Sequence, residues 1–129
     1  MEKGYVLVVD DNMDVRMLLS DVLTMMELPN KHASDGAQAL VAVQEERPSL
    51  IVLDLMMPVM DGFTFLTKLS STLKNEHIPV VLLSAIAEDI DSMKNLPNVR
   101  GVLRKGSFSI GELRSMLENI LEQPDPDRI

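Results

Sequence analysis

Three short runs of Val, Ile and Leu constrain the fold of this chain more than any other feature of its sequence. They are Tyr5–Asp10 (YVLVVD), Leu50–Asp54 (LIVLD) and Pro79–Ser84 (PVVLLS). Each run is almost continuously apolar instead of alternating with polar residues, which is typical of parallel strands covered on both faces. Two further candidates, Val99–Arg104 and the weaker Asn30–Ser34, bring the expected number of strands to five.

Segments with helical periodicity separate these runs. The helix candidates are 14–27, 35–46, 63–73, 88–96 and 110–122. Most of them place apolar residues at the i, i+3, i+4 spacing of one helix face, and Asp35 is a plausible N-cap. The poorest candidate is 88–96, which is short, acidic at its start and closed by Pro97. Because strands and helices alternate, we predict an α/β doubly wound, five-stranded parallel sheet with helices on both faces and right-handed crossovers.

The length and charge of the chain limit what it does. A length of 129 residues suits one domain, which we expect over residues 1–123, followed by a polar tail or linker start over 124–129. The net charge of −8 argues against direct binding of nucleic acid or anionic lipid. The absence of cysteine excludes a disulfide scaffold and fits a cytoplasmic location. No apolar run approaches the roughly 18 residues of a membrane span, so we expect no membrane insertion.

Polar side chains follow the expected strands at the points where they end. The first run ends in Asp10 and Asp11, the run at 50–54 ends in Asp54, and the last two runs are closed by Ser84 and Lys105. Open α/β sheets bind ligands at the carboxyl ends of their strands. These five side chains are therefore expected to gather at one edge of the sheet.

Such a site would place the carboxylates of Asp10, Asp11 and Asp54 against one ammonium group, that of Lys105. Like charges at short range raise one another's pKa unless a cation intervenes. Mg²⁺ suits the site best, because it binds through one or two carboxylates, waters and a phosphate. A carboxylate there can also act as a nucleophile and form an aspartyl phosphate, with Lys105 and Ser84 stabilising the transferring oxygens.

With these residues in place, residues 4–122 resemble the receiver domain of two-component response regulators, a CheY-like domain. The matching motifs are Asp10-Asp11, Asp54 followed by Met57-Pro58 and Asp61-Gly62, Ser84-Ala85, and Lys105. Each motif alone is short. Their order and spacing across five strands make the resemblance specific.

The resemblance implies a flavodoxin-like sheet with strand order 2-1-3-4-5 and a phosphoacceptor switch that assists its own phosphorylation and dephosphorylation. It implies that Asp54 is the phosphoacceptor and that Mg²⁺ is held by Asp11, Asp54, the backbone carbonyl of Met56 and, through water, Asp10. It also implies that Ser84 binds a phosphoryl oxygen and that Lys105 pairs with the phosphoryl group and Asp54. The donor would be a phosphohistidine on a sensor histidine kinase or a phosphotransfer protein. The output protein or domain and a homodimeric state are left open.

Three positions depart from the family pattern. Gly106 follows the lysine where the family usually has proline after a cis peptide, so we expect a trans bond here. Val102 replaces the aromatic switch residue three positions before the lysine, which puts aromatic coupling in doubt. The short, acidic segment 88–96 suggests an atypical output surface.

Met56, two residues past Asp54, cannot orient an attacking water by a strong hydrogen bond, which predicts slow loss of the phosphate.

Other functions remain open at this point. A degenerate receiver would act only as a phosphorylation-independent protein-interaction module, an alternative that Gly106 and Val102 keep open. An aspartate-nucleophile phosphatase also combines Asp, Ser, Lys and Mg²⁺, but it usually has a second Asp where this chain has Met56. A flavin-binding protein would need aromatic stacking residues, and the chain has no Trp and only Tyr5 as its tyrosine.

Overall fold

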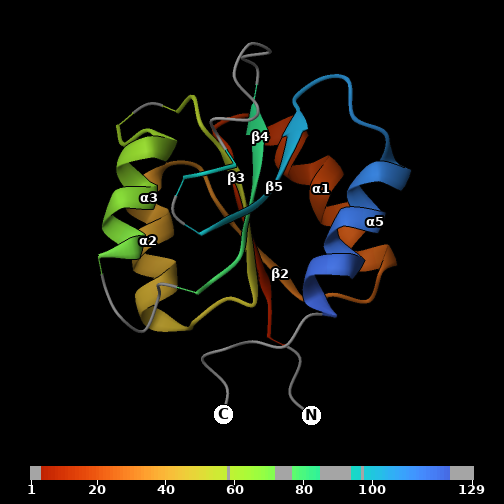
Figure 1. Cartoon of the computed structure of the whole chain (residues 1–129), viewed down its shortest axis with the longest axis horizontal. Coiled ribbons are helices and arrows are strands. Elements are labelled where there is room, and N and C mark those ends of the chain that lie inside the picture. Colours follow the sequence, from red (N-terminus) through yellow and green to blue (C-terminus); the bar gives the residue numbers. More distant parts are fainter. Residues whose placement is uncertain (1–3, 58, 72–76, 85–93, 97, 123–129) are drawn as a thin grey trace.

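The computed structural model describes residues 4–57, 59–71, 77–84, 94–96 and 98–122. In chain order its elements are β1 (Val6–Val9), α1 (Met13–Met25), β2 (Asn30–Ala33), α2 (Gly36–Glu45), β3 (Leu50–Asp54), α3 (Gly62–Ser70), β4 (Val80–Ser84), β5 (Val99–Arg104) and α5 (Ile110–Leu121). The strands form one parallel sheet with the order β2-β1-β3-β4-β5 (Figure 1). The predicted fold class and strand order are confirmed.

Helices cover both faces of this sheet. Helices α2 and α3 lie on one face and α1 and α5 on the other (Figure 1). The side chain of Phe65 and those of alternate strand residues such as Leu53 pack in the first layer. Leu19 and Leu117 pack with the remaining strand residues, such as Val52, in the second. Every residue of β1, β3 and β4 is therefore buried, which explains why these runs are continuously apolar.

Short polar side chains start the described helices beside the carboxyl ends of the strands. The carboxylate of Asp35 accepts a hydrogen bond from the Gln38 amide at 2.8 Å, which confirms the predicted N-cap of α2. Asp61 caps α3, and Asn12 caps α1. These caps satisfy amide groups that a helix leaves without partners at its start, so each helix begins at a defined residue close to the strand end.

Gly62 brings the start of α3 close to the end of β3. A Cβ atom at this position would lie 2.7 Å from Leu55 Cα and 2.9 Å from the carbonyl oxygen of Asp54. The Gly62 amide also donates a hydrogen bond to the Leu55 carbonyl at 3.0 Å. The Asp61-Gly62 pair thus has the structural role of packing a helix against the strand that ends in Asp54.

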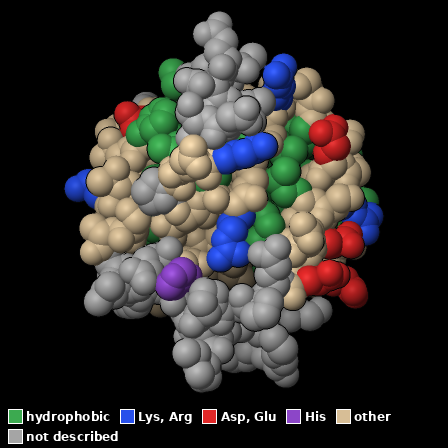
Figure 2. All heavy atoms as spheres, viewed as in Figure 1, with side chains coloured by type: hydrophobic (Ala, Val, Ile, Leu, Met, Phe, Trp, Pro, Cys, Tyr) green, Lys and Arg blue, Asp and Glu red, His purple; other side chains and the backbone are tan. Residues whose placement is uncertain are grey.

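Both edge strands carry polar residues. On β2, Lys31 and His32 are exposed, and this polarity made the strand the weakest of the five candidates. Arg100 and Arg104 are exposed on β5. Figure 2 shows lysine and arginine side chains across the middle of the viewed face, and aspartate and glutamate side chains toward its right margin. Charged side chains discourage the pairing of an edge strand with another chain.

Two expectations fall largely outside the described residues. The candidate helix 88–96 is described only at 94–96, where the chain turns. The polar tail expected over 124–129 lies beyond the described part, and the domain boundary at 123 stays a prediction. Across the described ranges, none of the helices has both the length and the apolar character that a membrane crossing requires.

Candidate functional site

Four polar residues lie at the carboxyl ends of four neighbouring strands of the sheet. Asp10 follows β1, Asp54 and Ser84 are the last residues of β3 and β4, and Lys105 follows β5. Asp10 and Asp54 are 0% and 1% exposed, and Ser84 is 2% exposed. Such complete burial of carboxylates is rare unless they are paired, because a buried unpaired charge is costly.

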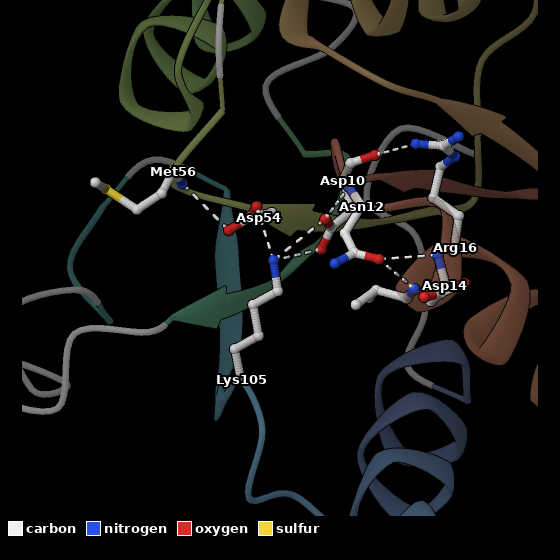
Figure 3. A network of polar contacts seen from close by, with 8 residues as sticks. Asp10, Asn12, Asp14, Arg16, Asp54, Met56 and Lys105 are labelled. Atoms are coloured by element: carbon white, nitrogen blue, oxygen red, sulfur yellow. Dashed lines mark hydrogen bonds and ion pairs between the residues drawn. The ribbon is translucent and has the colours of Figure 1, made fainter.

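Lys105 joins the two buried carboxylates (Figure 3). Its Nζ atom lies 3.0 Å from Oδ2 of Asp54 and donates a hydrogen bond to that oxygen. The same Nζ atom lies 3.2 Å from Oδ1 and 3.0 Å from Oδ2 of Asp10. The backbone amide of Lys105 donates to the Ser84 carbonyl at 2.8 Å. The ends of β1, β3, β4 and β5 are therefore linked through one residue.

Asp11 completes a group of three carboxylates. Ligand oxygens of Asp10, Asp11 and Asp54 all lie within 4.8 Å of one another. Asp11 is exposed, whereas the other two are buried, so the group opens to solvent on the side of Asp11. The structure thus brings together the residues at which the sequence indicated a site.

The electrostatics of the group follow from its burial and its charges. Burial raises the pKa of Asp54, and the charge of Asp10 adds to the rise, while the hydrogen bonds from Lys105 and the Met56 amide oppose it. Burial of the Lys105 ammonium lowers its pKa, but its hydrogen bonds to Asp10 and Asp54 outweigh this effect and raise the pKa overall. Three carboxylates face one ammonium group, so the group carries an excess of negative charge.

This donor set fits a hard divalent cation. Carboxylate oxygens are the ligands that Mg²⁺ prefers. Oδ2 of Asp10 is buried and accepts no hydrogen bond within the described structure, although Lys105 lies near it as an ion pair. A buried oxygen in this state has coordinating capacity left, and the excess negative charge favours a cation.

Main-chain contacts orient Asp10. Its amide donates to the Ala33 carbonyl of β2 at 3.1 Å. Its Oδ1 atom accepts a hydrogen bond from the Asn12 amide at 2.9 Å. Its carbonyl oxygen accepts a hydrogen bond from Nη1 of Arg16 at 2.7 Å. Arg16 was not among the residues singled out from the sequence, and its only signal there is a basic residue six positions after Asp10.

Asp54 is also held from the loop that follows β3. Its Oδ1 atom accepts a hydrogen bond from the Met56 amide at 3.2 Å. The Met56 side chain is 58% exposed, and Figure 3 shows it pointing away from the Asp54 carboxylate. Met56 therefore contacts the acid through its backbone and offers no polar side-chain atom to a water at the site.

Lys105 reaches the site although neighbouring positions depart from the family pattern. The bond between Lys105 and Gly106 is trans, as expected. Gly106 has φ 90°, a value that L-residues with a side chain rarely adopt, so glycine's freedom shapes the loop that aims Lys105. Val102 is partly buried against the layer that contains α2 and α3. Its small apolar side chain packs where the family has an aromatic ring.

Comparison with known proteins identifies the family. The family model described as "Response regulator receiver domain" matches residues 6–123. Sporulation initiation phosphotransferase F of Bacillus subtilis is 31% identical over 117 residues, which are 90% of this chain and 92% of that protein.

Two solved structures are similar as well. Chemotaxis protein CheY4 of Vibrio cholerae is 26% identical with a TM-score of 0.83, covering 92% of this chain and 99% of that one. Response regulator TrrA of Thermotoga maritima, in complex with Mg²⁺–BeF, is 25% identical with a TM-score of 0.77, covering 91% and 98%. The chain spans about half the length of several other curated relatives, which are described as probable transcriptional regulators. The chain belongs to the response regulator receiver domain family of two-component phosphorelay signalling.

Proposed function

We propose that this domain is a phosphoacceptor switch that receives a phosphoryl group on Asp54 in the presence of Mg²⁺. The observation that carries the proposal is the pairing of the buried Asp54 carboxylate with Lys105 Nζ at 3.0 Å, beside the carboxylates of Asp10 and Asp11. The complex of one relative supports the cation, since TrrA was solved with Mg²⁺–BeF.

The proposed transfer uses Asp54, Lys105 and Ser84. A carboxylate oxygen of Asp54 forms a bond to phosphorus, while the phosphorus–nitrogen bond of a phosphohistidine breaks and its electron pair leaves with the imidazole. Lys105 stabilises negative charge on the carboxylate and on the phosphoryl oxygens, and the Ser84 hydroxyl donates to a phosphoryl oxygen. Asp11, Asp54 and the Met56 carbonyl, with Asp10 through water, would hold Mg²⁺, and the bound ion would supply charge neutralisation that one lysine cannot give to three carboxylates and a phosphoryl dianion.

The donor is proposed to be a sensor histidine kinase or a phosphotransfer protein. This follows from family membership and from the relative that is itself described as a phosphotransferase. Because several relatives are about twice as long as this chain, the output is proposed to reside in a protein or domain outside the described residues. Phosphorylation would shift an existing equilibrium between two conformations of the receiver.

The first test is intact-mass measurement after incubation with acetyl phosphate and Mg²⁺. We expect the wild-type chain to gain one phosphoryl group that is labile in alkali, and Asp54→Asn to gain none. Asp21→Asn is the matched control, since it makes the same charge change at an exposed position on α1. It is expected to be phosphorylated as well as the wild type.

The competing functions give different results in this experiment. No mass gain in the wild type would indicate a phosphorylation-independent interaction module. Rapid release of inorganic phosphate from unrelated phosphoesters would indicate a phosphatase. The second result is not expected, because the exposed Met56 side chain stands where a phosphatase would need a general acid.

A further inference from the structure

Arg16 on α1 lies outside the group of three carboxylates. Its side chain nevertheless forms a hydrogen bond to the backbone of Asp10, which belongs to that group. Nη1 of Arg16 donates to the carbonyl oxygen of Asp10 at 2.7 Å, as Figure 3 shows. Hydrogen bonds from a charged donor are stronger than those between neutral groups, and a distance of 2.7 Å is at the short end of their range. Arg16 therefore connects α1 to the carboxyl end of β1, the strand that precedes this helix in the chain.

The contact lies just past the end of the pairing between β1 and β3, which stops at Val9 and Leu53. At Asp10 the sheet holds the chain only through β2, by the hydrogen bond from the Asp10 amide to the Ala33 carbonyl. Two residues after Asp10, Asn12 is already fixed, because its side chain accepts hydrogen bonds from the amides of Asp14 and Val15. Between these two anchors, the Arg16 side chain holds the peptide group that joins Asp10 to Asp11.

The orientation of that peptide decides where Asp11 lies. The carbonyl of Asp10 and the amide of Asp11 belong to one planar unit, so holding the carbonyl oxygen restricts the direction in which the chain reaches Asp11. Among the described residues, no side-chain hydrogen bond or ion pair is made by Asp11 itself. The position of the Asp11 carboxylate beside Asp10 and Asp54 is therefore set by the Asp11 backbone.

We propose that Arg16 is a positioning residue that holds the Asp10–Asp11 peptide so that the Asp11 carboxylate stays in the cation-binding group. The proposal rests on the proposed function, because it assumes that this group binds a divalent cation. It assigns Arg16 no contact with the cation or the phosphoryl group.

The direction in which cation affinity changes on removal of Arg16 distinguishes a positioning role from a purely electrostatic one. The guanidinium is a positive charge near a group that would bind a cation, so by Coulomb repulsion alone its removal would strengthen cation binding. Positioning predicts the opposite. Loss of a group that orients a metal ligand commonly weakens metal binding by about 10- to 100-fold, and we expect the lower end of that range.

The experiment measures the affinity of the full chain for Mn²⁺, a spectroscopic substitute for Mg²⁺, from the electron paramagnetic resonance signal of the free ion. Arg16→Met is expected to bind Mn²⁺ about tenfold more weakly than the wild type. Arg16→Lys retains a charged donor and is expected to recover part of the affinity. The matched control is Arg114→Met, which removes the same charge from an exposed position on α5. It is expected to leave the affinity unchanged.

A second readout needs no cation. In amide NMR spectra of the metal-free protein, Arg16→Met should shift the signals of Asp11 and Asn12, whereas Arg114→Met should not. If Arg16→Met does not fold, Arg16→Gln makes the same charge change with a polar side chain, and the same weakening is expected.

Two outcomes would overturn the proposal while leaving the proposed function intact. One is an unchanged or higher affinity of Arg16→Met for Mn²⁺, and the other is an equal loss in Arg16→Met and Arg114→Met. If the wild type itself neither binds Mn²⁺ nor gains a phosphoryl group, the proposed function fails, and the role of Arg16 fails with it.

Discussion

At the scale of single residues, the site depends on side chains whose chemistry is set by burial. Asp54 is 1% exposed and is accompanied by Lys105 and the Met56 amide. The acids and the lysine could be predicted from the sequence, because continuous apolar runs end visibly at Asp10 and Asp54 and the last candidate strand is followed by Lys105. The role of Arg16 could not, because it depends on how α1 turns its side chain back toward β1.

Met56 is expected to influence how long the phosphate survives. Its side chain points away from Asp54 and offers no strong hydrogen bond to a water. In Met56→Asn, a carboxamide that holds an attacking water should speed the loss of phosphate. A hydrogen bond of about 1 kcal/mol corresponds to about a fivefold increase in rate. Intact-mass spectra taken over time after removal of acetyl phosphate would measure this rate.

The control for this variant is Met25→Asn, which introduces the same side chain at an exposed position on α1. Its rate should equal that of the wild type. A Met56→Asn variant that keeps its phosphate as long as the wild type would show that the side chain at this position does not limit hydrolysis.

We expect the free energy of unfolding to depend on the protonation of Tyr5 at alkaline pH. Its hydroxyl donates to the Glu46 carbonyl at 2.7 Å and to the Ala42 carbonyl at 3.2 Å, at the end of α2. Burial, followed by the charges of Glu46 and Glu45, raises the pKa of Tyr5 from 10.0 to about 12. The folded state therefore favours the protonated phenol. The resulting stability is present below pH 10 and is lost as the pH rises toward about 12.

Because Tyr5 is the only tyrosine and tryptophan is absent, tyrosinate absorbance reports on this residue alone. We expect a midpoint near 12 in the folded protein and near 10 in denaturant. Tyr5→Phe should lower the free energy of unfolding at neutral pH by about 1 kcal/mol for the lost hydrogen bonds. Equal midpoints in the two states would contradict this expectation.

At the scale of secondary-structure elements, the sequence predicted the strands closely, and it predicted the starts of the described helices to within a residue. The strands at 50–54 and 99–104 have the predicted bounds. The run Tyr5–Asp10 was longer than the strand, Val6–Val9, because apolar Tyr5 continues the buried pattern before pairing begins. Helix α1 starts at Met13 instead of residue 14, since the cap is Asn12 and not a later residue.

The junction between β3 and α3 offers a test at this scale. A methyl group at Gly62 would meet the backbone of Leu55 and the carbonyl of Asp54, neither of which can move without shifting the strand end. We expect Gly62→Ala to lower the free energy of unfolding by about 1–3 kcal/mol, as overpacking commonly does, and to slow phosphorylation of Asp54. Chemical denaturation and timed mass spectra would measure the two effects.

Gly111 in the first turn of α5 is the matched control. A Cβ atom there would have only the Ser109 hydroxyl near it, at 3.8 Å. Gly111→Ala should therefore leave stability unchanged or raise it by up to about 1 kcal/mol, because alanine favours the helix. If both variants changed stability equally, the close approach at Gly62 would not be responsible.

At the scale of the whole molecule, the net charge of −8 has two components. Most of the acidic residues that the structure describes, such as Asp35 and Asp61, cap helices or lie at the surface. Asp10, Asp11 and Asp54 instead form one group at the carboxyl edge of the sheet. The strand order changes direction between β1 and β3, and doubly wound sheets place their ligand sites outside the carboxyl ends of the strands at such a point.

The measurement that tests the central claim most directly locates the phosphoryl group. Borohydride reduces an aspartyl phosphate to homoserine, which tandem mass spectrometry identifies in the peptide that contains it. After treatment with acetyl phosphate and Mg²⁺, we predict homoserine at position 54 and at no other aspartate. Homoserine at another position, or none in a wild-type chain that is folded and supplied with Mg²⁺, would contradict the assignment of Asp54 as the phosphoacceptor.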